Sequence, residues 1–352
     1  MRILFVARRY PPDVQAGAET AFAALVHQAR AAGHDTRLVA GWTRDRSLIP
    51  EDALGVDLRG RGPGAAQFAI WRAARGELAR WKPDVVLTNT IEAPVTRVPT
   101  IGLIHDLHFG RTEPNTKTRL RAALTRARAA RFARVIVPSI ATRDALTALG
   151  LSRIDVIPLG VDLERFVPPP TRPVSEPVEL LCPGRILAGK AQHVAIDAVA
   201  RLNVLEKKRV ILRIIGVSGD PIYLDQLKVQ SYRQPVVFEP GDTDLAAAYP
   251  KSDLVVLPSL LHEGFGVSAM EAMACGRPVV WTDQPGVREA TAGIGFPVPP
   301  DDAVAIRDLI RAFLKDPTPF LAAGAAGRAH VAPHHGWAEV WRHVERVLQG
   351  VV

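Results

Sequence analysis

Two carboxylates eight positions apart, Glu263 and Glu271, flank two glycines in the segment LVVLPSLLHEGFGVSAMEAMACGRPVV, residues 254–280. The apolar run, the glycines and the Ala/Met-rich residues predict a strand, a glycine loop and a helix in that order. The backbone N–H groups of residues 264–268 and the positive end of the helix would then favour a phosphate at one place. Carboxylates are poor partners for a phosphate, but they accept hydrogen bonds from sugar hydroxyls. The pair therefore indicates a ligand that carries both groups, a sugar nucleotide.

A simpler arrangement fits an isolated pair of glutamates better. Glu263 can cap the helix, and Glu271, about one and a half turns into it, can lie on a solvated face. The surrounding residues argue against this simpler arrangement. The string around EGFG and EAMACGRPVV resembles the signature of the retaining GT-B glycosyltransferases of family 4, also called group 1, in which seven residues separate two glutamates. With the matches described below, this resemblance extends over nearly the whole chain.

The resemblance implies an α/β protein with the GT-B fold, in which two Rossmann-like α/β/α domains face each other across a cleft. Residues 1–166 would form the acceptor-binding domain and residues 178–330 the donor-binding domain. The proline-dense residues 167–177 cannot join a central strand and are predicted to form the linker. Residues 331–352 would form a terminal helix that crosses back to the first domain, although its tryptophans could equally belong to the second core.

The composition is compatible with two cores. The chain has 352 residues, of which 47% are hydrophobic and 23% charged. Cys182 and Cys275 match no metal or redox spacing, so we expect two small buried residues and a reduced, cytoplasmic setting. No apolar run approaches the roughly 20 residues of a membrane span, and the first run is too short for a signal peptide. The formal charge of +8 favours anionic partners such as nucleotide diphosphates, phospholipid surfaces or nucleic acid. Of these, we expect no nucleic-acid partner.

Two cations stand at the end of a predicted strand in the segment CPGRILAGK. Arg185 and Lys190 match the family's GRxxxxK segment, and the resemblance places them at the donor diphosphate, where guanidinium binds bidentately and ammonium acts as a point charge. A surface ion pair is the weaker alternative, because both cations belong to one loop. Together with the helix dipole they would do the work of a metal, so neither a metal ion nor another cofactor is expected.

The resemblance assigns the remaining donor contacts. Glu271 would bind the ribose hydroxyls, while Glu263 and the amides near Phe265 and Gly266 would hold the transferred sugar. The implied donor-binding residues are Gly17, Arg185, Lys190, Phe238, Pro240, Glu263, Gly264, Phe265, Gly266, Val267 and Glu271.

Two of these assignments have simple structural alternatives. Gly17 belongs to an AGAE segment that resembles the family's GGxE loop, with Ala16 in place of the first glycine, and it could serve only to permit a turn. Phe238 and Pro240 precede a helix predicted to begin near Asp242, and a plain strand-to-helix turn would look the same as a loop that contacts the base.

A histidine follows the predicted strand of PTIGLIHDLHFG. His105 and Asp106 match the acceptor side of the family's site, and a neutral histidine can donate to a hydroxyl or a developing oxyanion. A histidine that only ties down a loop is an equally good explanation. The catalytic residues that the resemblance implies are Glu263, His105, Arg185 and Lys190.

Residues 111–134 contain seven arginines and one lysine against one glutamate. A basic helix of this kind would suit a peripheral contact with an anionic membrane. The charges, however, fall on two sides of the predicted helix, which favours a solvated helix instead.

The resemblance implies a retaining, metal-independent hexosyltransferase. Its donor would be a UDP-sugar, with a GDP-sugar as second choice, and its acceptor a glycan, a glycolipid or a small-molecule hydroxyl in cell-envelope or exopolysaccharide biosynthesis. The enzyme would be cytoplasmic or peripheral at the inner face of the membrane. Both front-face attack and a covalent intermediate remain open, with the first preferred. One alternative is a non-catalytic sugar-nucleotide-binding protein; another is a different nucleotide-sugar enzyme on a doubly wound fold, for which RRYPPDVQAGAE lacks the expected G-x-G-x-x-G.

Overall fold

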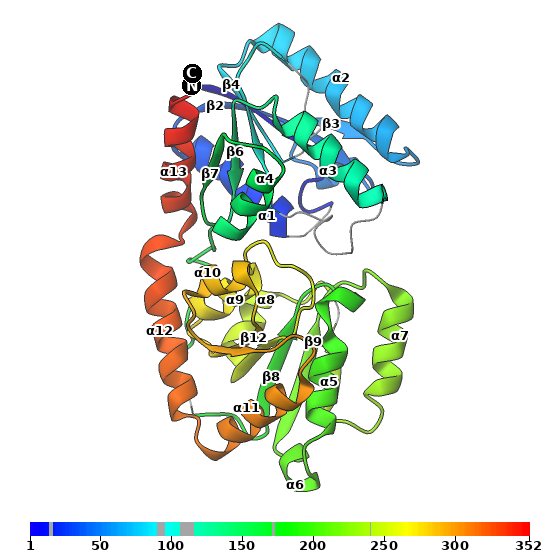
Figure 1. Cartoon of the computed structure of the whole chain (residues 1–352), viewed down its shortest axis with the longest axis vertical. Coiled ribbons are helices and arrows are strands. Elements are labelled where there is room, and N and C mark those ends of the chain that lie inside the picture. The colour runs from blue at the N-terminus through cyan, green and yellow to red at the C-terminus, as the bar shows by residue number, and fades with distance from the viewer. Residues whose placement is uncertain (14–16, 90–95, 106–115, 171–172, 240) are drawn as a thin grey trace. The chain divides into compact units, whose positions relative to one another are not determined.

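The computed structural model describes residues 1–13, 17–89, 96–105, 116–170, 173–239 and 241–352, except for the side chains of residues 116–121. By its internal contacts the chain divides into two units, Met1–Gly160 with Trp337–Val352, and Val161–Gly336. Figure 1 shows each unit as a sheet with helices on both sides. The proline-dense segment expected as a linker, residues 167–177, thus belongs to the second unit.

The first unit is built on a parallel sheet with the described strand order β3-β2-β1-β4-β5-β6-β7. Its strands are β1 (Arg2–Ala7), β2 (Asp35–Trp42), β3 (Leu54–Asp57), β4 (Val85–Thr88), β5 (Thr100–Leu103), β6 (Arg134–Val137) and β7 (Ile154–Val156). Its helices are α1 (Gly17–Ala31), the 3₁₀ helix η1 (Arg46–Leu48), α2 (Pro63–Trp81), α3 (Thr116–Ala129), α4 (Ile140–Ala148) and α13 (Trp337–Gln349).

The first strand shows why helices cover both faces of this sheet. Successive residues of a strand point to opposite faces, and β1 is apolar on both. Ile3 and Phe5 pack in the same core as Phe22 of α1, whereas Leu4 packs with Ile70 of α2 on the other face. A central strand in an α/β/α sandwich requires this pattern.

The terminal helix α13 belongs to the first unit. Val340, Trp341 and Leu348 are buried in the core that contains Phe22 of α1. A Cβ on Gly160, where the first unit reaches its boundary, would lie 2.6 Å from the Trp337 side chain. The apolar stripe of the helix therefore completes the first core and not the second.

The second unit contains a parallel sheet with the described order β10-β9-β8-β11-β12-β13. Its strands are β8 (Val178–Pro183), β9 (Val210–Ile215), β10 (Val236–Glu239), β11 (Leu254–Leu257), β12 (Val279–Thr282) and β13 (Phe296–Val298). Its helices are η2 (Ala188–Lys190), α5 (Gln192–Ala200), α6 (Val204–Lys207), α7 (Pro221–Gln230), α8 (Leu245–Ala248), η3 (Tyr249–Lys251), α9 (Val267–Ala274), α10 (Pro285–Thr291), α11 (Ala303–Lys315) and α12 (Thr318–His334).

Helices again cover both faces of the second sheet. Leu180 and Leu254, from the central strands, share one core with Phe313 of α11. On the other face α9 packs against α12, where a Cβ on Gly327 would lie 2.8 Å from Met273. This packing holds α9 and the loop before it at the carboxyl end of β11.

The helix predicted to begin near Asp242 has its N-cap two residues later. Asp244 is the N-cap of α8, and its carboxylate accepts a hydrogen bond from the Ala246 amide at 3.1 Å. The predicted helix is therefore present, but its N-cap is Asp244 and not Asp242. Both aspartates are good N-caps, and local preference alone does not choose between them.

Candidate donor-sugar site

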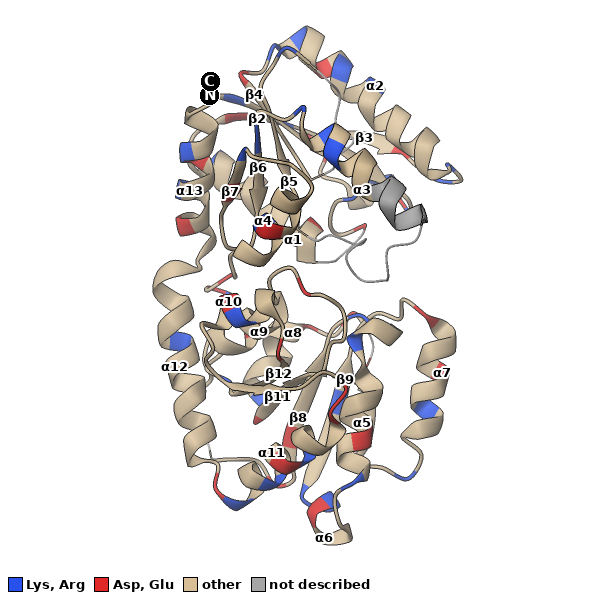
Figure 2. Ribbon diagram, in the orientation of Figure 1, with Lys and Arg blue, Asp and Glu red and all other residues tan. Residues whose placement is uncertain are grey.

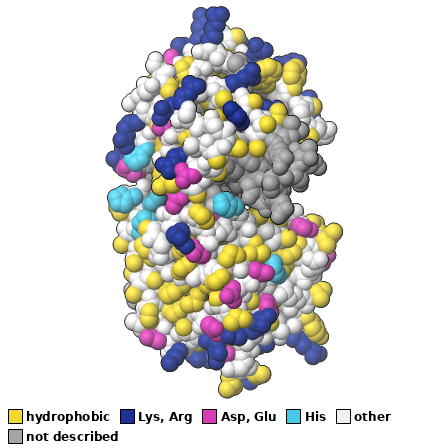
Figure 3. Space-filling model, viewed as in Figure 1, with side chains coloured by type: hydrophobic (Ala, Val, Ile, Leu, Met, Phe, Trp, Pro, Cys, Tyr) yellow, Lys and Arg dark blue, Asp and Glu magenta, His cyan; other side chains and the backbone are white. Residues whose placement is uncertain are grey.

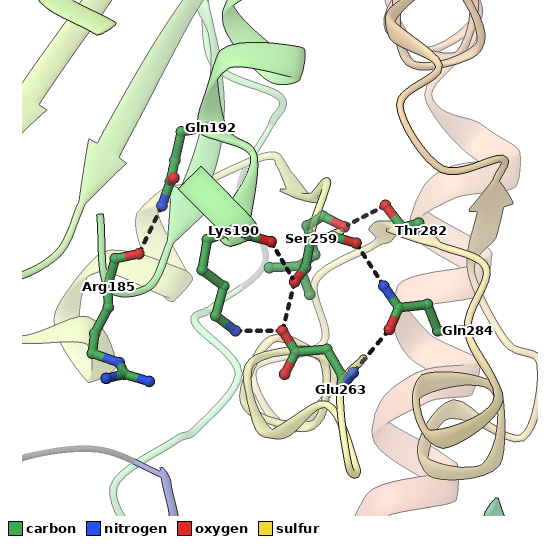
Figure 4. Close-up of polar contacts among 9 residues, drawn as sticks. Arg185, Lys190, Gln192, Ser259, Glu263, Thr282 and Gln284 are labelled. Carbon is green, nitrogen blue, oxygen red and sulfur yellow. Dashed lines mark hydrogen bonds and ion pairs between the residues drawn. The ribbon is translucent and has the colours of Figure 1, made fainter. Parts of the chain in front are cut away.

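Three loops meet at the carboxyl ends of neighbouring strands in the second unit, and two of them carry predicted donor residues. Arg185 follows β8, Glu263 follows β11 and Gln284 follows β12, and these strands are adjacent in the sheet. Ligands of open parallel sheets bind at this edge. Figure 4 shows that the three loops converge there, with the Lys190 and Glu263 side chains in contact.

The loop after β8 presents an arginine to solvent. Gly184 has φ +128°, and a Cβ on Gly216 would lie only 1.9 Å from the Gly184 carbonyl oxygen, so the ends of β8 and β9 approach closely. The buried Gln192 side chain donates from Nε2 to the Arg185 carbonyl at 3.0 Å. The Arg185 side chain is exposed, and within the described parts of the chain its guanidinium has no partner. It is thus available to an anionic ligand.

The Glu263 carboxylate lies between a cation and a hydroxyl. Its Oε1 accepts from Lys190 Nζ at 2.5 Å and from Ser259 Oγ at 2.7 Å. Both ionic side chains are about one fifth exposed. Glu263 is not the helix cap considered above, because the N-cap of α9 is Gly266. Gly266 has φ +88°, and no side chain caps the helix there.

The Glu271 carboxylate lies within α9, beside a tyrosine hydroxyl. The hydroxyl of the fully buried Tyr249 donates to Glu271 Oε2 at 3.0 Å. Burial raises the pKa of Glu271 to about 7, even though this hydrogen bond and the charges of Arg165 and Lys190 lower it. Glu271 is only partly exposed, and its charge can change near neutral pH.

The glycine loop contains one buried aromatic anchor. Phe265 is 4% exposed, and its ring centroid lies 6.1 Å from that of His335. Gly264 and Gly266 flank this anchor, and Val267 opens α9. The loop is thus held to the second unit by its own aromatic residue.

The other predicted residues lie elsewhere or outside the description. His105 follows β5 in the first unit; burial lowers its pKa to about 4, and neither ring nitrogen has a partner among the described residues. Gly17 is the exposed first residue of α1, and Phe238 of β10 packs partly against the second core. Asp106 and Pro240 lie outside the described residues.

Three residues of this region were not predicted from the sequence: Ser259, Tyr249 and Gln284. Ser259 and Gln284 are polar residues just after β11 and β12, so their places at the carboxyl ends of strands were an available signal. Tyr249 lies 22 positions before Glu271, and only the packing of η3 against α9 brings the two together.

The structure also describes the other features singled out in the sequence. In the described residues, no three His, Cys, Asp or Glu side chains gather as metal ligands. Cys182 and Cys275 are free and buried, and burial raises both thiol pKa values to about 12. None of the helices within the described ranges combines the length and hydrophobicity that crossing a membrane requires.

The basic segment, residues 111–134, is described only in part. Arg126 is exposed near Gly150, whereas Arg134 is paired with Asp155 on the neighbouring strand, with Nε to Oδ2 at 2.7 Å. Figure 2 places further basic residues on α2 and α13, and Figure 3 shows them scattered over this face of the first unit. The described basic residues do not form one continuous patch in this view.

Comparisons with known proteins agree with this architecture. A family model described as "Glycosyltransferase Family 4" matches residues 16–165, and one described as "Glycosyl transferases group 1" matches residues 177–316. The chain is 27% identical to glycogen synthase from Mycobacterium tuberculosis over 387 residues, covering 97% of this chain and 92% of that protein. The two family models together span both units.

The chain belongs to glycosyltransferase family 4. The family predicted from the EGFG and EAMACGRPVV strings is thereby confirmed, and the protein is a glycosyltransferase.

Solved structures confirm the GT-B fold of this family 4 member. HepE from Anabaena, solved in complex with UDP, matches with a TM-score of 0.81 at 22% identity, covering 99% of this chain and all of that one. Sucrose-phosphate synthase from Thermosynechococcus elongatus matches with a TM-score of 0.85 at 21% identity, covering 99% and 98% of the two chains. The predicted pair of Rossmann-like α/β/α domains is therefore correct.

Proposed function

We propose that this family 4 glycosyltransferase transfers a hexose-type sugar from a nucleoside-diphosphate sugar with retention of configuration and without a metal ion. The contact between Lys190 Nζ and Glu263 Oε1, at 2.5 Å, carries the proposal. It places a cation suited to phosphate beside a carboxylate suited to sugar hydroxyls. A donor in which phosphate and sugar are joined by one bond would meet both groups at once.

The second unit offers complementary groups along such a donor. Arg185 and Lys190 would neutralise the diphosphate, and the N-terminus of α9 would add its partial positive charge. Charge builds up on the diphosphate as its bond to the anomeric carbon breaks, so these groups would stabilise the transition state more than the ground state. Glu271 would bind the ribose hydroxyls and Glu263 the transferred sugar.

The hydrogen bonds of Glu263 support retention by front-face attack. Its Oε1 is already shared by Lys190 and Ser259, an arrangement that suits a group that holds the sugar. In front-face attack the acceptor hydroxyl would approach from the side of the leaving diphosphate, which could take its proton. On the acceptor side of the first unit, a neutral His105 would hydrogen-bond the acceptor hydroxyl.

We propose a UDP-sugar as the donor, with a GDP-sugar as the second choice. HepE, which shares the fold, has been solved in complex with UDP and with UDP-glucose. The acceptor would be a glycan, a glycolipid or a small-molecule hydroxyl in envelope or exopolysaccharide synthesis. A cytoplasmic enzyme that contacts the inner membrane through residues 111–134 would suit a lipid-linked acceptor.

Arg185→Ala provides a clean test of donor binding. Because the guanidinium is exposed and unpartnered within the described residues, its loss should leave the melting temperature unchanged. We expect UDP-glucose to bind at least about tenfold more weakly, as for loss of a charge-assisted hydrogen bond. Arg201→Ala, which removes an exposed arginine paired with Asp197 on α5, is the matched control.

A panel of nucleotide sugars in a thermal-shift assay should identify the donor, because a ligand at 100 times its dissociation constant stabilises by about 2.7 kcal/mol. Transfer or slow hydrolysis of the donor that shifts the melting temperature would support the proposal. Stabilisation without either reaction would indicate a binding protein, and the absence of any shift would contradict nucleotide-sugar binding.

A further inference from the structure

The loop that carries Glu263 is fastened by a side chain from a different segment. Gln284 lies between β12 and α10 and is 8% exposed. Its Nε2 donates to the Ser259 carbonyl at 2.6 Å, and its Oε1 accepts from the Glu263 amide at 2.9 Å. Figure 4 shows both hydrogen bonds from one amide group. The two ends of the five-residue stretch 259–263 are thus held by a single side chain.

An amide is well suited to this task because it has a donor and an acceptor in one plane. Ser259 offers a carbonyl and Glu263 an N–H, which require opposite partners. A carboxylate would match only the N–H, and an apolar side chain would match neither. Glutamine therefore fits this place for a chemical reason and not only for its size.

The backbone next to Gln284 packs closely against the same loop. A Cβ on Gly286 would lie 2.3 Å from the Glu263 carbonyl oxygen and 2.8 Å from that of Gly264. The N-terminal turn of α10 is thus in direct contact with the loop. Gln284 acts from within this contact.

The opposite side of the loop is joined to the segment that carries Lys190. The amides of Leu260 and Leu261 both donate to the Gly189 carbonyl at 2.9 Å. Ser259, whose carbonyl Gln284 holds, also donates from Oγ to Glu263 Oε1 at 2.7 Å. The position of the Glu263 carboxylate against Lys190 therefore depends on a loop held from two sides.

We propose that Gln284 is a positioning residue for sugar transfer, which sets the 259–263 backbone so that Glu263 meets Lys190 and the donor sugar. Gln284 contacts no reacting atom in this role; it acts through Glu263. The effect of Gln284 on turnover rests on the proposed function. The clamp, by which we mean the two hydrogen bonds from Gln284 to the Ser259 carbonyl and the Glu263 amide, rests only on the geometry above.

Gln284→Met removes both hydrogen bonds at nearly constant volume. We expect turnover to fall by about ten- to a hundredfold, as for a misplaced catalytic contact. Affinity for UDP should stay within about twofold, because Arg185 and Glu271 would hold the nucleotide. Hydrogen exchange of the Glu263 amide should become about five- to tenfold faster. Gln230→Met is the matched control, since that glutamine donates to the His193 carbonyl on α5.

Gln284→Glu gives a second readout that a purely structural role would not move. The introduced carboxylate would repel the Ser259 carbonyl, but once protonated it could donate to that carbonyl again. Turnover relative to wild type, compared at each pH, should therefore recover as the pH is lowered. This variant also provides the test if Gln284→Met does not fold.

The outcomes separate the clamp from the function. Unchanged exchange at the Glu263 amide in Gln284→Met would overturn the clamp. Faster exchange with wild-type turnover, or a Gln284→Glu deficit that does not depend on pH, would overturn the positioning role. A wild-type protein without transferase activity on any nucleotide sugar would contradict the proposed function, and amide exchange would still decide the clamp.

Discussion

Replacing Glu271 by glutamine removes a carboxyl group whose ionisation the fold opposes. Burial raises the pKa of Glu271 from 4.5 to about 7. Glutamine keeps the size of the side chain and an oxygen that can accept from the Tyr249 hydroxyl, which lies 3.0 Å from Oε2. It does not titrate. The substitution therefore separates the charge of this side chain from its shape.

The expected effect on donor binding follows from the ionised fraction. If the ribose hydroxyls bind the carboxylate, the apparent dissociation constant is the intrinsic value divided by that fraction. A pKa of about 7 lowers the fraction from about nine tenths at pH 8 to about one tenth at pH 6. We therefore expect the wild type to bind its donor about tenfold more weakly at pH 6, and Glu271→Gln to bind weakly at both values.

The effect on stability has the opposite direction. The pKa of Glu271 is higher in the folded state than in the unfolded state, so the folded protein binds this proton more tightly. The proton therefore adds to the free energy of unfolding. This contribution is fully present below pH 4.5 and is lost as the pH rises through about 7. This contribution to the free energy of unfolding is about 3 kcal/mol at most, because the residue is partly exposed and solvent screens its charge. Glu271→Gln should thus raise the free energy of unfolding above pH 7 and change it little below pH 4.5.

Calorimetry at pH 6 and pH 8 measures the binding part of this prediction. The ligand should be intact UDP-glucose, because the terminal phosphate of UDP itself titrates near pH 6. Glu176→Gln, at an exposed glutamate, is the control and should retain the wild-type pH dependence. A wild-type affinity that changes less than twofold between the two pH values would refute the reasoning, as would a tenfold change that persists in Glu271→Gln.

Four further outcomes are expected. Glu263→Gln should lower turnover and leave UDP affinity within about twofold, because its contact would strengthen only in the transition state; a loss of UDP affinity as large as that of Glu271→Gln would mean that the donor lies the other way round. Transfer should survive EDTA, and loss with rescue by manganese or magnesium would contradict metal independence. Binding to anionic vesicles through residues 111–134 should fall steeply with salt, since each basic residue adds about 1 kcal/mol that salt screens; salt-insensitive or absent binding would favour a solvated helix. Trp341→Ala should destabilise the first unit to urea by about 3–5 kcal/mol, whereas a change below 1 kcal/mol would show that α13 contributes little to that core.

Local patterns in the sequence were sufficient for the strand, glycine loop and helix at the centre of the second unit. The apolar run before Pro258 is β11, and the Ala/Met-rich residues after the glycines are α9. Strands buried on both faces are continuously apolar, and a helix after a glycine loop needs no distant partner to be recognised. The family signature could be identified for the same reason, since its residues are close together in the chain.

The sequence by itself thus determined the family, the pair of α/β/α domains and the two cations and two glutamates expected at the donor. Only the tertiary structure decided which groups these residues contact. Lys190 meets Glu263 across 73 positions, Tyr249 meets Glu271, and Gln284 reaches back to Ser259. These contacts depend on the order of parallel strands and on side chains that cross from one loop to the next, and neither is encoded in local periodicity. The raised pKa of Glu271 has the same origin, because burial is a property of the packed unit and not of any one segment.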